Sequence, residues 1–264
     1  MTCQPTLRAR VIGIAVALAL ATGPTGAQQP AGGTPRAGGP RLSRADVLAR
    51  LSAASEAQPA DFAGQDLSGL DLSGVDLSRA KLSGAHLDRA RLVHARMFSV
   101  DLDHATAREA DLTGAVLDVS AMRAADFSHS ILRDASLYAV IMPGANFTDA
   151  DLTGVRLIAA ADGAIFVRAT LVHADVGADP RNQPMGVMRT DFTNADLSGA
   201  DLTSANLRKA RLVRANFTGA NLSGADLALT DLTDAIFHQI RGRSTIKGLD
   251  RAIDVAGAHW DSTP

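Results

Sequence analysis

The sequence predicts an all-β solenoid, because a large apolar residue returns at every fifth position over most of the chain. In each group of five, this central residue follows a small residue, usually alanine, and a polar residue. A period of five fits neither an α-helix nor a lone strand, whose side chains repeat every 3.6 and 2 residues. A short fixed repeat is instead typical of stacked coils that pack on their neighbours.

The central residues keep their phase over long stretches, so the solenoid is expected to be nearly continuous. Twenty groups run from Phe62 to Leu157, three have centres at Phe166, Leu171 and Val176, and ten run from Phe192 to Phe237. We expect the central and small residues to face inward. Two segments break the phase. Residues 158–163 add four positions, and residues 179–188 contain two prolines and interrupt the coil.

The repeating unit, as in Ala195-Asp196-Leu197-Ser198-Gly199, resembles that of the pentapeptide-repeat family. The resemblance covers about 60–239. It implies a right-handed quadrilateral β-helix, in which four pentads form one coil of twenty residues, and about eight coils in all. We refer to the places of each pentad as small, polar, central, fourth and last. Glycine in the last place suits corners that need unusual φ angles.

Charge and aromatic spacing support a coil of twenty residues independently of the family. Asp71, Arg91 and Asp111 occupy the polar place at steps of twenty and alternate in sign. In stacked strands about 4.8 Å apart, such neighbours attract one another. Two pairs of central phenylalanines are also twenty apart, so their rings are expected to stack inside the coil: Phe127 with Phe147, and Phe217 with Phe237.

The first 27 residues resemble a secretory signal peptide. Arg8 and Arg10 precede the apolar run 11–21, and small residues precede Gln28. Eleven residues reach about 16 Å as a helix, too short for the roughly 30 Å core of a bilayer. We therefore expect cleavage, a periplasmic or secreted protein with no stable membrane anchor, and loss of Cys3, the single cysteine.

The remaining chain divides by composition. Residues 28–41 are rich in glycine and proline and are expected to form a linker. Residues 42–58 predict a short N-terminal capping helix, with Ser43 and Asp46 as its capping box and an apolar stripe at Val47, Leu48 and Leu51. The repeat region is expected at 59–239, with a loop insertion at about 178–189. Residues 240–264 leave the repeat and predict a C-terminal cap or tail, through which two copies could pair.

The sequence carries no constellation of catalytic or cofactor-binding residues that we recognise. A solid interior offers no concave site for catalysis, and the recurring aspartates suit hydrogen bonding and charge alternation along an exposed face. The column Glu109, His129 and Asp149 offers only three ligands on a flat face, so we interpret it as a salt ladder rather than a metal site. We expect no enzyme activity, no cofactor and no metal.

The interruption near residue 180 is the strongest candidate for recognition, because loops on a rigid scaffold often bind partners. The candidate residues are Asp179, Pro180, Arg181, Asn182, Gln183 and Pro184. The alternative is a corner insertion without a role, since longer loops cost little free energy.

We therefore predict an exported, non-enzymatic scaffold or interaction protein whose partner is an unidentified protein. Nucleic acid is not expected, because the net charge is −2, or −4 after signal removal. One alternative is a DNA mimic that protects gyrase, as some members of the family do, although alternating charges break up the acidic face. A second alternative is a carbohydrate-binding or hydrolytic role. Few aromatic residues are expected on the surface to support it, namely Phe98, Tyr138 and Trp260.

Overall fold

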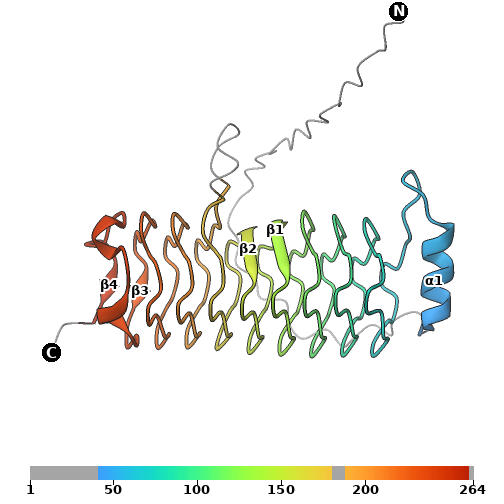
Figure 1. Cartoon of the computed structure of the whole chain (residues 1–264), viewed down its shortest axis with the longest axis horizontal. Coiled ribbons are helices and arrows are strands. Elements are labelled where there is room, and N and C mark those ends of the chain that lie inside the picture. The colour runs from blue at the N-terminus through green and yellow to red at the C-terminus, as the bar shows by residue number, and fades with distance from the viewer. Residues whose placement is uncertain (1–40, 180–187, 262–264) are drawn as a thin grey trace, which may run out of the picture. The chain divides into compact units, whose positions relative to one another are not determined.

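The computed structural model describes residues 41–179 and 188–261 (Figure 1). The predicted signal peptide and nearly all of the predicted linker, together with Pro180–Pro184 of the candidate loop, lie outside these residues. The regular elements are α1 (Arg44–Ala53), β1 (Ser136–Ile141), β2 (Arg156–Ala160), β3 (Ile236–Phe237), the 3-10 turns η2 (Arg243–Thr245) and η3 (Leu249–Arg251), and β4 (His259–Trp260). Within the described ranges, no helix has the length and apolar character needed to cross a bilayer.

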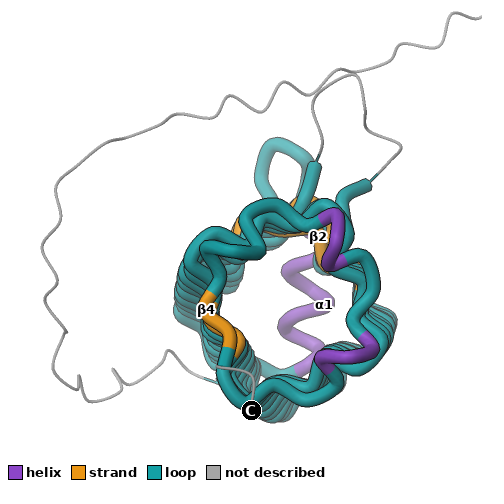
Figure 2. Tube along the Cα trace, turned by 90° about the vertical axis from the view of Figure 1, so that its left-hand side faces the viewer, coloured by secondary structure: helices purple, strands orange, loops and turns teal. Residues whose placement is uncertain are grey.

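Residues in the polar place form a parallel ladder between successive turns of chain. Asp71 pairs with Arg91, which in turn pairs with Asp111, so the step is twenty residues. The Leu72 N–H donates to the Arg91 carbonyl at 2.7 Å, and the Arg91 N–H donates to the Leu70 carbonyl at 2.8 Å. Each pentad thus forms one side of a coil, and Figure 2 looks along the stacked sides.

The ladder continues through the whole of the described repeat region. Along one side the paired residues are Asp61, Lys81, Asp101, Ala121, Ile141, Ala160, Asp191, Arg211, Asp231 and Ile253. These nine steps span roughly 43 Å at about 4.8 Å each. Ten paired residues in this column mean nine to ten coils, more than the eight or so expected from the sequence.

The pentad closes each corner with local hydrogen bonds. The last place has a left-handed backbone, as at Gly144 with φ 65°. The N–H of the next small residue then donates to the preceding central carbonyl, as from Ala80 to Leu77 at 2.9 Å. An aspartate in the polar place accepts from the N–H two residues ahead, as Asp66 does from Ser68 at 2.9 Å. This Asx geometry explains why aspartate recurs there.

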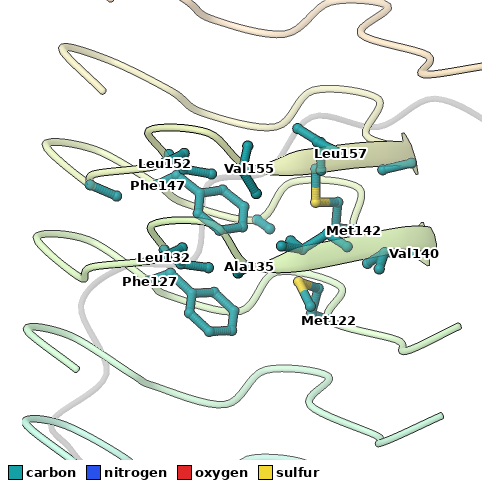
Figure 3. Packing of buried hydrophobic residues seen from close by; sticks show 14 of the residues in the cluster. Met122, Phe127, Leu132, Ala135, Val140, Met142, Phe147, Leu152, Val155 and Leu157 are labelled. Atoms are coloured by element: carbon teal, nitrogen blue, oxygen red, sulfur yellow. The ribbon is translucent and has the colours of Figure 1, made fainter. Parts of the chain in front are cut away.

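Central and small side chains fill the interior of the stack (Figure 3). Phe127 and Phe147 stack with ring centroids 5.2 Å apart, and Phe147 stacks on Phe166 at 5.0 Å. Phe217 and Phe237 form a second stack at 4.9 Å. The rings spaced twenty residues apart are therefore in contact, as the sequence indicates.

Residues 158–163 correct the sequence interpretation of an insertion. Ile141 pairs with Ala160, so this coil is one residue shorter than the others, not longer. In β2, Ile158 lies opposite Tyr138 and Ala159 opposite Val140, and the register shifts between these two pairs. Ala161 is fully buried in the central place. The pentad of Leu157 has lost its last residue, opposite Ala139, and the complete pentad 159–163 that follows has the small Ala161 at its centre.

The C-terminal segment was expected to leave the repeat, yet it remains in the ladder. Its pairs are Asn221 with Arg241, Asp226 with Lys247, Asp231 with Ile253, and Ile236 with His259. The step lengthens from 20 to 23 residues because η2, η3 and the turn at residues 255–257 each add one residue at a corner. Trp260 stacks on Phe237 with centroids 4.3 Å apart. The predicted cap is thus a final, irregular coil.

Candidate functional site

The filled interior confines any functional chemistry to the surface of the stack. Within residues 41–179 and 188–261, no group of three or more His, Cys, Asp or Glu side chains is arranged to hold a metal ion. His129 lies 3.9 Å from Asp149, which Arg168 also contacts at 2.6 Å. Hydrogen bonds from Arg168 hold the pKa of Asp149 below its usual value. The two acids of this column thus pair with arginines, Glu109 with Arg89 at 3.3 Å and Asp149 with Arg168.

Ion pairs between successive coils neutralise many of the surface aspartates. Asp71 lies 3.2 Å from Arg91, and Asp103 lies 2.8 Å from Arg123. These contacts divide the acidic residues among basic neighbours, so the alternation predicted from Asp71, Arg91 and Asp111 is present on the folded surface.

The insertion leaves the ladder at one corner of a single coil. Ala160 pairs with Asp191, and Ile165 with Asp196, so partners across this coil are thirty-one positions apart. The Asp179 N–H donates to the Met188 carbonyl at 3.0 Å, which brings the two ends of the insertion together. Of the six loop residues proposed from the sequence, the structure describes only Asp179.

A clasp of polar and aromatic side chains fixes the base of this insertion. The Asp179 side chain is 5% exposed, and one of its oxygens accepts a hydrogen bond from Arg156 Nη2 at 2.9 Å. The Arg156 guanidinium lies 4.7 Å from the centre of the Tyr138 ring. The Tyr138 hydroxyl donates to Met188 Sδ at 3.4 Å. Arg156, Tyr138, Asp179 and Met188 are called the insertion clasp below.

A shallow hollow of about 480 Å³ lies beside the insertion clasp. Its lining residues are Arg156, Ile158, Asp175, Gly177, Ala178, Asp179 and Asn206. Asn206 Nδ2 donates to Asp175 Oδ1 at 2.7 Å. The polar groups of the hollow therefore bind one another, and the hollow forms part of a surface with fixed side chains.

Exposed apolar side chains occupy the same side of the stack, on the coils that precede Tyr138. Phe98, Val116 and Val119 are 42%, 37% and 45% exposed. The Ser99 N–H donates to the Asp118 carbonyl, and the Val119 N–H to the Tyr138 carbonyl at 2.7 Å, so these corners lie on successive coils. We call Phe98, Val116 and Val119 the apolar strip. It leads along one corner toward the insertion clasp.

Sequence reasoning located the insertion but missed the residues that fix it. Arg156 occupies the polar place of a regular pentad, so its expected partner was a residue one coil away. Its contact with Asp179 depends on the return path of the insertion, which the spacing does not reveal. The apolar strip did carry a signal, since Val116 and Val119 stand at places that are usually polar or glycine.

Comparison with known families agrees with this geometry. The family model for pentapeptide repeats matches this chain in eight copies, over residues 60–93, 95–134, 120–157, 188–224 and 210–241. These ranges cover more than half of the chain. The chain belongs to the pentapeptide-repeat family. Members of this family form right-handed quadrilateral β-helices. Comparison with curated protein sequences finds no significant match.

Solved structures of pentapeptide-repeat proteins resemble this chain to different degrees. HetL from the cyanobacterium Nostoc, involved in heterocyst differentiation regulation, is 28% identical with a TM-score of 0.50, covering 83% of this chain and 95% of HetL. A trypsin-treated variant of QnrB1, a plasmid-mediated fluoroquinolone resistance protein, is 20% identical with a TM-score of 0.38, covering 69% and 91%. A pentapeptide-repeat protein from the Arabidopsis thaliana thylakoid lumen is 31% identical with a TM-score of 0.18, covering 47% and 66%.

Proposed function

We propose that this pentapeptide-repeat protein is an exported, non-enzymatic scaffold that binds a partner protein through the side carrying the apolar strip and the insertion. We infer that its coils form the right-handed quadrilateral β-helix of the family. The observation that carries the proposal is the insertion clasp, in which the nearly buried Asp179 carboxylate is held by Arg156. An insertion without a role has no need of a fixed base, whereas a fixed base limits the entropy lost on binding.

HetL supports the non-enzymatic part of the proposal by analogy. HetL is described as involved in heterocyst differentiation regulation, and the pentapeptide-repeat family to which both proteins belong is generally non-enzymatic. The apolar strip supports a protein partner, because clustered exposed apolar side chains mark interaction sites. Export follows from the predicted signal peptide, and places the partner in the periplasm or outside the cell. Pairing of two copies through the final coil remains a separate proposal, which the mass of the purified protein in solution tests.

The surface favours this scaffold over the two alternatives. A DNA mimic needs a continuous acidic face, and ion pairs such as Asp76 with Arg96 at 3.7 Å interrupt it. A sugar-binding platform needs free aromatic faces. Of the three candidates, Tyr138 lies beneath Arg156. The Trp260 ring centre lies 4.8 Å from Arg243, which leaves Phe98 by itself.

Proximity labelling in the native cell tests the proposal. Three forms of the chain, each fused to a labelling enzyme, are compared. They are the wild type, a loop variant with residues 180–187 replaced by two glycines, and a control with two glycines added after Gly144. The control site is chosen because the space beside the Gly144 Cα is open. We expect the control to label the wild-type partner and the loop variant to lose it. Identical neighbours in all three forms would remove the insertion from the proposal. Retention in the cytoplasm with residues 1–27 intact would favour the DNA mimic.

A further inference from the structure

The first coil presents an unpaired edge of the ladder toward α1. Within the stack, the carbonyls of the polar and fourth places accept hydrogen bonds from the preceding coil. Lys81 and Ser83, for example, accept from the N–H groups of Phe62 and Gly64 at 2.8 and 2.9 Å. The first coil has no coil before it, so its equivalent carbonyls need other donors.

Residues 41–50 supply donors to three of the four sides of this edge. The contacts are Arg50 Nη1 to the Asp61 carbonyl at 3.2 Å, the Leu42 N–H to the Asp66 carbonyl at 2.9 Å, Arg41 Nη2 to the Ser68 carbonyl at 2.7 Å, and Arg44 Nε to the Asp71 carbonyl at 2.8 Å. Three of these four donors are arginine side chains. The protein therefore caps its own carbonyl edge with cationic groups.

The fourth side has no such cap. Neither the Asp76 carbonyl nor the Ser78 carbonyl accepts a hydrogen bond from the residues that the structure describes. Ser73 Oγ and Ser78 Oγ, on neighbouring sides of this coil, are both buried with no hydrogen-bond partner among those residues. The sides of Asp61 and Asp71 each leave one equivalent carbonyl without a donor, at Ala63 and Ser73, so among the described residues only the side of Asp76 has both carbonyls free.

A groove of about 470 Å³ runs along this uncapped side. Its lining residues are Leu51, Ala54, Ser55, Glu56, Pro59, Ala60, Asp76, Ser78 and Arg79. Leu51 and Ala54 pack against the core and give the groove an apolar wall. At its rim, Glu56 contacts Arg79 at 2.6 Å. The groove therefore joins an apolar wall to two free carbonyls and to the carboxylates of Asp76 and Glu56, the second of which pairs with Arg79.

We propose that this groove binds an extended, arginine-bearing segment of a partner protein, which adds one further side to the ladder. In the register of the other coils, the segment donates two N–H groups to the Asp76 and Ser78 carbonyls. Its apolar residue packs against Leu51 and Ala54. Addition of a strand to an open edge is a common mode of peptide recognition, with backbone bonds giving affinity and side-chain pockets giving specificity.

Charge complementarity selects the arginine. On the opposite edge of Asp76 the neighbour is Arg96, at 3.7 Å, and the polar places elsewhere alternate in the same way, as between Asp191 and Arg211 at 3.5 Å. An arginine on the open edge of Asp76 continues this alternation.

The groove lies on the same side as the apolar strip, and the Arg79 N–H donates to the Phe98 carbonyl at 2.8 Å. It is several coils from the insertion, so replacement of residues 180–187, which tests the proposed function, leaves this site in place. The two proposals can therefore fail independently.

Amide chemical-shift titration of the purified chain tests the inference. The probe is a synthetic peptide of residues 208–217, which holds Arg211 in the polar place, and the control is the same peptide with Arg211→Asp, so that the two differ only at that place. We expect saturable shifts at residues 54–56 and 76–79, with affinity for the arginine peptide at least about threefold higher. Asp76→Asn keeps the oxygen that accepts from the Ser78 N–H and is expected to remove that preference. Asp231→Asn, at the far end of the stack, is expected to retain it.

Three outcomes would overturn the inference. The first is the absence of saturable shifts at millimolar peptide with a thermal melt that shows folded protein. The second is shifts confined to the final coil, which presents the other free edge. The third is binding only after deletion of residues 28–40, which would show that the chain's own N-terminal segment fills the groove.

Discussion

The last place of the pentad holds a left-handed backbone even where the residue is not glycine. Val119 has φ 63° and Leu229 has φ 62°. This conformation costs a residue with Cβ about 1–2 kcal/mol, and a β-branched residue is especially strained there. The ladder on both sides holds the corner in place, so the strain is tolerated. The recurring glycines of the sequence indicated where the corners lie. They gave no reason to expect that a valine would occupy a corner.

Replacing Val119 by glycine is expected to stabilise the protein. Glycine relieves the left-handed strain, and this gain exceeds the extra chain entropy that glycine brings to the unfolded state. We expect an increase of about 1 kcal/mol in the free energy of unfolding, measured by thermal and urea denaturation. The reverse change Gly144→Val is the matched control, because the space beside Gly144 is open and only backbone strain changes. A less stable Val119→Gly protein would contradict the account.

Asp88 is expected to make the stability of the protein depend on pH. Burial alone would raise its pKa, but hydrogen bonds from Arg108, one of them 2.8 Å long, outweigh burial and hold the pKa below its ordinary value. A carboxyl with a lowered folded pKa stabilises above its unfolded pKa of about 3.9, and this contribution is lost as the pH falls through the folded pKa.

The variant Asp88→Asn tests this dependence. Asparagine still accepts the Arg108 backbone N–H, which lies 3.0 Å from Oδ1, but it cannot ionise. We expect a lower melting temperature than wild type at pH 7 and a smaller difference at about pH 2 to 3. Melting temperatures measured across this range decide the matter. A constant difference at every pH would exclude the carboxylate as its cause.

At the scale of elements, α1 closes the N-terminal end of the core. The predicted capping box is present, since Ser43 Oγ accepts from the Asp46 N–H and Asp46 accepts from the Ser43 N–H. Val47 is fully buried against the first coil. A helix of this length is marginal by itself, so its stability comes from this packing.

Val47→Asp is expected to release α1 from the first coil. A buried carboxylate without a partner is costly, and the exposed ladder edge then favours association between molecules. We expect faster amide exchange in residues 44–62 and concentration-dependent aggregation by light scattering. The matched control is Ala49→Asp, on the exposed face of the same helix, which is expected to change neither. Unaltered exchange in Val47→Asp would contradict the capping role.

The insertion clasp is expected to be more sensitive to mutation than surface ion pairs. Arg156→Ala leaves the Asp179 carboxylate nearly buried without the Arg156 guanidinium, at a cost of about 1–3 kcal/mol. We expect local loosening, detected as faster proteolysis within residues 179–190. Arg133→Ala is the control, because the Arg133 side chain is exposed in its 2.6 Å contact with Asp151. Equal proteolysis of the two variants would show that the clasp does not fix the insertion.

The five-residue period of the sequence predicted the elements correctly where each side of a coil has five residues. The prediction failed where a side has a different length. The capping helix and the coil step followed from Ser43, Asp46 and the charge alternation at Asp71 and Arg91. Residues 158–163 were misread, because loss of one corner residue and the small central Ala161 together mimic an inserted stretch. Backbone pairing tolerates this change, since β2 keeps its parallel register with β1.

At the scale of the whole described stack, the two ends have opposite hydrogen-bonding character. The N-terminal edge presents mostly carbonyls, which arginines cap. The C-terminal edge presents mostly N–H groups. One coil inside it, side chains of the final coil accept from backbone N–H groups: Asp261 accepts from Gln239, and Thr245 Oγ1 accepts from Gly224 at 3.0 Å. The final coil was not predicted from the sequence, because its step lengthens to 23 residues and the five-residue period is lost there. The backbone pairs between the coils are nevertheless kept.

Disulfide trapping tests the central claim, that residues twenty apart lie side by side on successive coils. In a chain with Cys3→Ser, the pair Asp71→Cys with Arg91→Cys places two cysteines on a parallel bridge, where the Cα separation of adjacent strands permits a disulfide. The pair Asp71→Cys with Lys81→Cys places them on different sides. We predict complete intramolecular oxidation of the first pair and little of the second, measured by mass spectrometry of the folded protein. Oxidation of the second pair with none of the first would contradict the stacked coil.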